Sequence, residues 1–221
     1  MSDWRLAEGA STSLQTAFAD LDAVFALQGE LITQDPLSDV IRVELDGERY
    51  YVKRYHGAGK GARRFIGRPR VKAEWQNLKY FAKWGIATAP IVAHGMQRKA
   101  CLFERGALVT REIPHTQDLA QLAQHDDPRL HDRHWVERVS QQLAAATRTL
   151  HARHFTHNDL KWRNLLVDDE GKLFLIDCPT GSFWRGALLR YRIIKDLACL
   201  DKVAKYKLSR TQRLRFYLQY C

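Results

Sequence analysis

Residues 157–167 read His157-Asn158-Asp159-Leu160-Lys161-Trp162-Arg163-Asn164-Leu165-Leu166-Val167, and this stretch decides the fold. It places a carboxylate, an ammonium group and a carboxamide just before an apolar run. A carboxylate can orient a hydroxyl group and accept its proton, a carboxamide oxygen can bind a hard cation, and an ammonium group can neutralise a phosphate. Transfer of a phosphoryl group needs these groups and little covalent chemistry from the protein. We therefore assign Asp159 as a catalytic base, Lys161 as its catalytic cation and Asn164 as a metal ligand.

The surroundings of this stretch strengthen the assignment. Its letters match the kinase catalytic-loop pattern H-x-D-L-x-x-x-N, with Asn158 where that pattern usually has Arg. A hairpin-like segment, DDEGKLFLID, then brings Asp177 to the end of a strand, 18 residues after Asp159. That is the place of the metal-binding aspartate of the D-F-G motif. The alternative is that both aspartates only cap helices or turns.

Further upstream, two segments alternate as strands do. VIRVEL (40–45) and ERYYVKRY (48–55) flank Asp46-Gly47, a dipeptide that favours a tight hairpin turn. Lys53 is the expected phosphate-contacting lysine, because its strand resembles the V-A-I-K strand of kinases. Its ion-pair partner should be a carboxylate on the next helix, and Glu74 is the only acidic residue between Arg49 and Lys99. A solvated lysine and a solvated glutamate are the alternative.

The order of the expected elements indicates an α+β fold with two lobes. Apolar periodicity predicts helices over about 12–28, 69–84 and 135–154. Alternation predicts two or three further strands, around 91–96, 99–104 and 107–113. We expect a small N-lobe, residues 1–113, built from an antiparallel sheet and the helix at 69–84. Residues 114–221 form the expected helical C-lobe, which carries the catalytic loop 157–164.

The composition limits the cellular compartments and the classes of partner that are compatible with the sequence. The 221 residues carry a formal charge of +10, so we expect anionic partners such as nucleotides, acidic lipid head groups or phosphorylated sugars. Four scattered cysteines without a C-x-x-C pair fit free thiols in a reducing cytoplasm. No apolar run approaches the about 20 residues of a membrane span, and MSDWRLAEGA is unlike a signal peptide. A cytoplasmic protein is expected, and a peripheral position on a membrane stays open.

The sequence resembles the lipopolysaccharide core sugar kinases, the family of Kdo and heptose kinases. The resemblance covers most of the chain and rests on VKRY, AEWQNLKYFAKWGIATAP, HNDLKWRNLLV, LID and IIKDLACL. It implies a protein-kinase-like fold and an enzyme that uses ATP and Mg²⁺ to phosphorylate a sugar hydroxyl of the lipopolysaccharide inner core. The implied partners are a lipid-linked core oligosaccharide and the anionic inner face of the cytoplasmic membrane.

The same resemblance adds residues to the site. It implies an ATP site with Lys53, Glu74 and Glu112. Asp196, in KDLA, would lie on a helix beneath the catalytic loop and hydrogen-bond its backbone; a solvent-exposed aspartate is the alternative. His157 is expected to support the loop from inside. His151 and His154 are expected at the surface, because their spacing does not form a metal site.

Three departures from the kinase pattern shape the expected mechanism. No G-x-G-x-x-G precedes Lys53, so the cover over the phosphates would come from the irregular segment LITQDPLSD (31–39). D-F-G reads Asp177-Cys178-Pro179, which disfavours a flipping segment, and Cys178 is expected to be buried. Asn158 removes the cation that reads a phosphorylated activation loop. We therefore expect a site that is assembled at all times.

Two basic segments lie outside these motifs. Residues 53–72 hold eight Lys or Arg and no acid. The expected acceptor or membrane patch within them comprises Lys60, Arg63, Arg64, Arg68 and Arg70. Residues 185–215 hold ten Lys or Arg with aromatic residues between them, but no nucleic-acid motif, so we expect no nucleic-acid partner. A solvated face is the alternative for basic runs of this kind.

Three functions are compatible with the sequence. The first is a lipopolysaccharide core sugar kinase. The second is a compact protein kinase or small-molecule phosphotransferase of the same fold. The third is a membrane-associated pseudokinase scaffold, which binds nucleotide without turnover. The presence of Lys53, Asp159, Asn164 and Asp177 disfavours the scaffold, which would not need all four.

Overall fold

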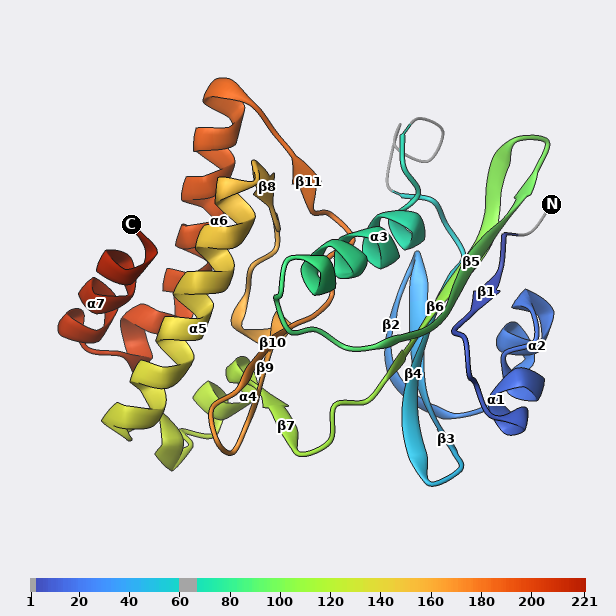
Figure 1. Ribbon diagram of the computed structural model, residues 1–221, viewed down its shortest axis with the longest axis horizontal. Helices are drawn as coiled ribbons and strands as arrows, with labels where there is room; N and C mark the ends of the chain where they lie inside the picture. The colour runs from blue at the N-terminus through green and yellow to red at the C-terminus, as the bar shows by residue number, and fades with distance from the viewer. Residues whose placement is uncertain (1–2, 60–66) are drawn as a thin grey trace. The chain divides into compact units, whose positions relative to one another are not determined.

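The computed structural model describes residues 3–59 and 67–221, which form two compact units. The first unit is Met1–Leu78 with Ala89–Ile113, and the second is Lys79–Thr88 with Pro114–Cys221. Helix α3 (Arg70–Lys83) therefore begins in the first unit and ends in the second (Figure 1). Three residues of the expected basic patch lie outside the described residues: Lys60, Arg63 and Arg64.

An antiparallel sheet of six strands forms the centre of the first unit, in the order β1-β5-β6-β4-β3-β2. Its strands are β1 (Arg5–Leu6), β2 (Glu30–Asp35), β3 (Ser38–Leu45), β4 (Glu48–Tyr55), β5 (Ile91–Lys99) and β6 (Leu102–Arg111). The predicted hairpin between β3 and β4 is confirmed. Asp46 and Gly47 form its turn with φ of 55° and 75°, the left-handed pair that matches the twist of the two strands.

The two or three strands expected after α3 are two, β5 and β6, and the segments around 99–104 and 107–113 fall largely in the single strand β6. The turn before it lies at Ala100 and Cys101, whose φ values are 48° and 65°. The segment LITQDPLSD is not irregular but forms the β2–β3 hairpin. Its turn is held by Asp35, whose Oδ1 accepts a hydrogen bond of 2.7 Å from the N–H of Leu37. Such an Asx turn leaves no trace in apolar periodicity.

The helix expected over 12–28 is two helices, α1 (Thr12–Ala17) and α2 (Leu21–Ala26). The chain breaks between them because the side chain of Asp20 accepts a hydrogen bond from the N–H of Ala23 and so starts a new helix. Most of the predicted apolar stripe still packs on the sheet as part of its core: Leu14, Phe18 and Leu21.

Helices dominate the second unit. They are α4 (Leu119–Gln124), α5 (Arg133–Ala152), α6 (Gly186–Lys207) and α7 (Arg210–Tyr220), with 3₁₀ turns η2 (Pro128–Leu130) and η3 (Trp162–Asn164). The strong helix predicted over 135–154 is confirmed as α5. Asp132 caps it by accepting a hydrogen bond of 2.8 Å from the N–H of His134. Its apolar stripe is buried at Val136, Val139, Leu143 and Leu150.

Two small antiparallel sheets accompany these helices, in the orders β10-β9-β7 and β11-β8. Their strands are β7 (Thr116–Asp118), β8 (Phe155–Thr156), β9 (Leu165–Asp168), β10 (Leu173–Leu175) and β11 (Ser182–Phe183). Ser182 on β11 pairs with Thr156 on β8. The segment after Asp177 therefore runs beside the chain that enters the catalytic loop.

Candidate active site

The first unit supplies a lysine–glutamate pair. Lys53 lies on β4, between Val40 of β3 and Leu108 of β6. Its Nζ is 3.1 Å from Oε1 of Glu74, which lies on α3. The glutamate side chain is 5% exposed and the lysine 17%, so the two charges meet where water screens them little. The predicted ion pair is present.

Tyr55 also bonds Glu74, and the sequence analysis did not identify this contact. The fully buried Tyr55 donates a hydrogen bond from its hydroxyl group to Oε2 of Glu74. Tyr55 and Lys53 share one face of β4, because side chains alternate along a strand. That alternation is the signal that could have found it. Two donors from one strand thus fix the carboxylate that orients the lysine.

Glu112 follows β6 and is bonded within the sheet. The hydroxyl of Tyr51 donates to its Oε1 at 3.0 Å, and its N–H donates to the carbonyl of Arg49 at 2.8 Å. Burial, followed by the charge of Glu112, raises the pKa of Tyr51, which keeps this hydroxyl protonated and donating. The N–H and one carboxylate oxygen of Glu112 therefore have partners within the sheet.

In the second unit, Asp159 lies in the loop between β8 and η3. Its Oδ1 is 2.5 Å from Nζ of Lys161, and its Oδ2 is 3.5 Å from the guanidinium of Arg163. Asn164 is buried and donates from Nδ2 to the backbone carbonyl of Asp159 at 2.8 Å. Because its nitrogen makes this bond, the amide oxygen of Asn164 is the atom available to a cation.

Asp177 is joined to Asn164 through the backbone. The N–H of Ile176 donates to the carbonyl of Asn164 at 3.0 Å, so the two expected metal ligands stand on neighbouring segments. Asp177 has φ of 55°, a left-handed conformation that is unusual for a residue with a side chain and recurs at functional sites.

The donor set at Asn164 and Asp177 fits Mg²⁺. Mg²⁺ prefers oxygen ligands and is commonly held by one or two carboxylates together with substrate phosphates. Within residues 3–59 and 67–221, no group of three or more His, Cys, Asp or Glu side chains could hold a metal. An ion bound at Asn164 and Asp177 would take its remaining ligands from water and from the nucleotide phosphates.

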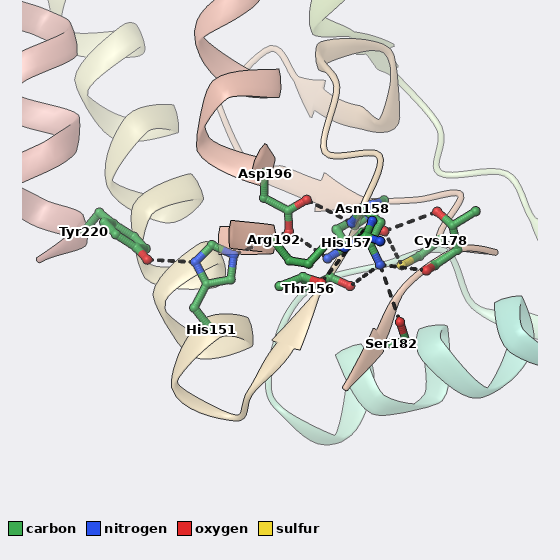
Figure 2. A network of polar contacts seen from close by, with 10 residues as sticks. His151, Thr156, His157, Asn158, Cys178, Ser182, Arg192, Asp196 and Tyr220 are labelled. Atoms are coloured by element: carbon green, nitrogen blue, oxygen red, sulfur yellow. Dashed lines mark hydrogen bonds and ion pairs between the residues drawn. The ribbon is translucent and has the colours of Figure 1, made fainter. Parts of the chain in front are cut away.

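A buried aspartate on α6 supports the catalytic loop (Figure 2). Asp196 is fully buried, and its two carboxylate oxygens accept hydrogen bonds of 2.8 Å from the N–H groups of His157 and Asn158. The buried ring of His157 stacks on Phe81, with centroids 5.9 Å apart. Burial lowers the pKa of His157, against the raising effect of nearby carboxylates, of which Asp196 is the strongest.

Asn158 ties the loop to the segment that follows Asp177. Its Nδ2 donates to the carbonyl of Thr180 at 2.8 Å, while its Oδ1 accepts from the hydroxyl of Thr156 at 3.1 Å. The buried Cys178 donates from Sγ to the carbonyl of His157 at 3.8 Å. Where the kinase pattern has an arginine, this chain has a neutral amide that bonds the segment directly.

The expectation that His151 lies at the surface is wrong. It is buried, with Nδ1 2.8 Å from the hydroxyl of Tyr220 and Nε2 3.4 Å from Oδ2 of Asp196 (Figure 2). The reason is that α7 brings Tyr220 against α5, a long-range contact that spacing within 151–157 does not reveal. His154 is exposed.

Arg68 and Arg70 are the described members of the expected basic patch. The guanidinium of Arg68 donates to Oε1 of Gln76 at 3.0 Å and to Oδ1 of Asn77 at 3.3 Å, so it lies along α3. The N–H of Arg70 bonds the carbonyl of Ala58 at 3.0 Å.

A lysine–glutamate pair on a sheet and its helix, and a loop that holds Asp159 near Asn164 and Asp177, are the arrangement typical of phosphotransferases with a protein-kinase-like fold. The chain belongs to the lipopolysaccharide kinase (Kdo/WaaP) family, whose model matches residues 27–220. It is a lipopolysaccharide core kinase, which uses ATP to phosphorylate a sugar hydroxyl of heptose or Kdo.

Known proteins of this family are distant in sequence and close in fold. The lipopolysaccharide core heptose(I) kinase WaaP of Pseudomonas aeruginosa is 28% identical over 218 residues, which cover 90% of this chain and 79% of that protein. The 3-deoxy-D-manno-octulosonic acid kinase of Pasteurella multocida is 31% identical over 115 residues, covering 51% of this chain and 45% of that kinase. The solved structure of WaaP in complex with acyl carrier protein superimposes with a TM-score of 0.77 at 25% identity, covering 98% of this chain and 88% of that one.

Proposed function

We propose that Asp159 is the catalytic base and that the acceptor is a lipid-linked core oligosaccharide. The observation that carries the proposal is the bond from Asn164 to the carbonyl of Asp159, because Asn164 is itself bonded to Ile176, the neighbour of Asp177. Asp159, Asn164 and Asp177 thus lie on stretches of chain that hydrogen bonds hold together. Phosphoryl transfer depends on such positioning more than on covalent chemistry.

In the proposed reaction, the acceptor hydroxyl gives its proton to Asp159 while its oxygen forms a bond to the γ-phosphorus of ATP. The bond from that phosphorus to the β–γ bridging oxygen breaks, and ADP leaves. Lys161 neutralises charge on the transferred group, and Lys53, held by Glu74, binds the nucleotide phosphates. Mg²⁺ held by Asn164 and Asp177 would neutralise the remaining phosphate charge.

We further propose that residues 1–113 and 114–221 act as the N-lobe and the C-lobe of the kinase. The β2–β3 hairpin then covers the phosphates in place of a glycine-rich loop. Among the described residues, no helix is both long and apolar enough to cross a bilayer. Because the proposed acceptor is lipid-linked, we propose the inner face of the cytoplasmic membrane as the place of action, which the chain would contact from the cytoplasm.

Phosphate transfer from ATP to dephosphorylated core oligosaccharide tests the proposal. Asp159→Asn should lower kcat by about 10²- to 10⁴-fold, the range of general-base catalysis, and leave the Kd for ATP unchanged. Asp177→Ala should instead abolish Mg²⁺-dependent nucleotide binding. Wild-type activity in Asp159→Asn would refute the assignment of the base, and transfer to protein in preference to the glycolipid would refute the acceptor.

A second proposal concerns an acyl carrier protein, the partner in the solved WaaP structure. This chain has a cavity of about 390 Å³ between α5, α6 and α7. Its lining is mainly apolar and includes Leu143, Trp162, Leu200, Leu214 and Tyr217. An aliphatic chain carried by such a partner would bury apolar surface in this cavity.

Calorimetric titration of the full chain with acylated and unacylated carrier protein tests this second proposal. Affinity should rise with acyl length, and Leu214→Trp, which fills the cavity, should remove that rise without changing the affinity for the unacylated form. Equal affinity for both forms would contradict a role of the cavity.

A further inference from the structure

The outer face of α6 has an unusual composition. Its exposed residues are glycine, apolar, aromatic or cationic: Gly186, Ala187, Leu188, Arg190, Tyr191, Ile194, Lys195, Ala198, Lys202, Lys205 and Tyr206. We call these residues the α6 outer face. A solvated helix face normally mixes both signs of charge with neutral polar residues. The α6 outer face has neither acids nor neutral polar side chains other than tyrosine.

The two acids of α6 do not offset this charge. Asp196 is fully buried beneath the catalytic loop. Asp201 accepts two hydrogen bonds of 2.7 Å from the guanidinium of Arg213 on α7. The cations at the outer face, among them Arg190 and Lys195, therefore have no acid of their own helix beside them.

Apolar side chains form the middle of the α6 outer face. Ala187, Tyr191, Ile194 and Ala198 follow one another at intervals of three or four residues, which places them in one stripe along the helix. Tyr191 is 59% exposed and Ile194 66%. The first turns of α6 extend past the end of α5 (Figure 1). From Ala187 to Tyr206 the face is about 30 Å long, at 1.5 Å per residue.

We propose that the α6 outer face binds an anionic lipid bilayer, with the helix lying along the head groups. Lysine and arginine beside the stripe would reach lipid phosphates while their methylene groups stay near the apolar layer. Ile194 and Leu188 would enter that layer, and Tyr191 and Tyr206 would lie at the interface. This inference rests on the peripheral membrane position proposed above and names the surface that would make the contact. Binding of the bilayer by this surface requires neither nucleotide nor catalysis.

The aliphatic residues favour a bilayer over a nucleic acid. Nucleic-acid grooves use aromatic rings for base stacking and cations for phosphates. Leu188 is 59% exposed and Ile194 66%, and neither side chain can stack on a base. A bilayer interface rewards both the cations and the aliphatic side chains.

Vesicle co-sedimentation of the full chain, without ATP or acceptor, tests the proposal. Vesicles of pure phosphatidylcholine are compared with vesicles that contain phosphatidylglycerol. Arg190, Lys195, Lys202 and Lys205 are changed together to Gln, which should lower partitioning onto the anionic vesicles by about 1,000-fold, at about 1 kcal/mol per cation. The matched control removes the same charge from exposed positions elsewhere in the second unit: Arg133, Arg138, Arg148 and Lys172, each to Gln. The control should lose less than about tenfold, because none of those cations belongs to α6.

A second variant separates insertion from charge attraction. Leu188→Gln with Ile194→Gln keeps every charge and should lower partitioning by about tenfold. Equal losses of vesicle binding in the two charge variants would overturn the proposal, and so would an unchanged partitioning of the apolar variant. Binding of the wild-type chain to RNA, with no binding to either kind of vesicle, would also overturn it. Because the assay contains neither substrate, these outcomes are distinguishable from a failure of the proposed kinase activity.

Discussion

The hydroxyl of Tyr220 lies 2.8 Å from Nδ1 of His151, and this contact connects the last helix of the chain to the catalytic loop. The opposite nitrogen of His151 is 3.4 Å from the carboxylate of Asp196. That carboxylate accepts the backbone N–H groups of His157 and Asn158. Tyr220 thus helps, through His151, to orient Asp196, whose carboxylate binds the backbone of the catalytic loop.

Tyr220→Phe should therefore affect both stability and turnover. Loss of the hydroxyl leaves Nδ1 of the buried His151 without its partner, which should cost about 1 kcal/mol in the free energy of unfolding. We expect kcat to fall while the KM for ATP stays constant, because the Lys53–Glu74 pair is untouched. Steady-state kinetics and urea unfolding check both effects.

His151→Phe completes a double-mutant cycle with Tyr220→Phe. If the two residues act through one contact, the double variant should lose less than the sum of the single losses. Additive effects on kcat would show that Tyr220 influences the loop by another route.

The pair at Lys53 gives a second prediction. Lys53→Met leaves the buried carboxylate of Glu74 with Tyr55 as its remaining donor from β4, and breaking a buried ion pair costs about 3–5 kcal/mol. We discount this to about 2 kcal/mol because Lys53 is partly exposed. Thermal unfolding should detect the loss, and kcat should fall by about 100-fold or more.

Tyr55→Phe is the graded comparison for that variant. It removes one donor to Glu74 and keeps the lysine, so kcat should fall by less than about tenfold. A larger loss than that of Lys53→Met would mean that Tyr55, and not Lys53, is the main orienting contact of Glu74.

The features of this molecule that were predicted correctly from the sequence are those that a short stretch of residues determines. The hairpin at Asp46-Gly47 follows from the φ preferences of two residues. The ion pair of Lys53 and Glu74 was inferred because Glu74 is the only acidic residue between Arg49 and Lys99. In both cases, short-range rules or simple elimination suffice.

The features that sequence reasoning missed depend on long-range contacts. His151 looked like a surface residue because its partners, Asp196 and Tyr220, are 45 and 69 residues away. The helix break at Asp20 and the hairpin at Asp35 depend on side-chain caps that apolar periodicity does not register.

His157 makes stability depend on pH. Its pKa in the folded protein lies below the usual value of about 6.5 because the ring is buried. Below about pH 6.5 the unfolded chain binds a proton at this residue that the folded chain does not, so the free energy of unfolding falls as pH falls. The slope that one titrating residue can contribute is at most about 1.4 kcal/mol per pH unit.

Urea unfolding between pH 7 and pH 5 measures that slope. His157→Gln removes the titrating group and should flatten the curve, whereas His134→Gln, at an exposed position on α5, should leave it unchanged. Parallel curves for the wild type and His157→Gln would contradict the assignment.

Three residues of the expected basic patch offer a prediction about the acceptor. Changing Lys60, Arg63 and Arg64 to Ala should raise the KM for the glycolipid and leave basal ATP hydrolysis unchanged, if these cations bind the anionic core. Arg133, Arg138 and Arg148, changed together, provide an equal loss of charge on α5. Similar rises of KM in both triple variants would indicate a general charge effect and not a binding site.

Asn158 provides the sharpest test of a site that is assembled without phosphorylation. Its φ of 64° suits asparagine or glycine, so Asn158→Gly keeps the backbone and removes the bond to the carbonyl of Thr180. We expect kcat to fall severalfold, with a loss of about 1 kcal/mol in stability, because the segment after Asp177 is no longer tied to the loop. Thr156→Val is the control, since it removes a bond to Asn158 but leaves this tether. Limited proteolysis should show faster cleavage between residues 178 and 185 in Asn158→Gly alone, and equal cleavage in both variants would mean that another contact holds the segment.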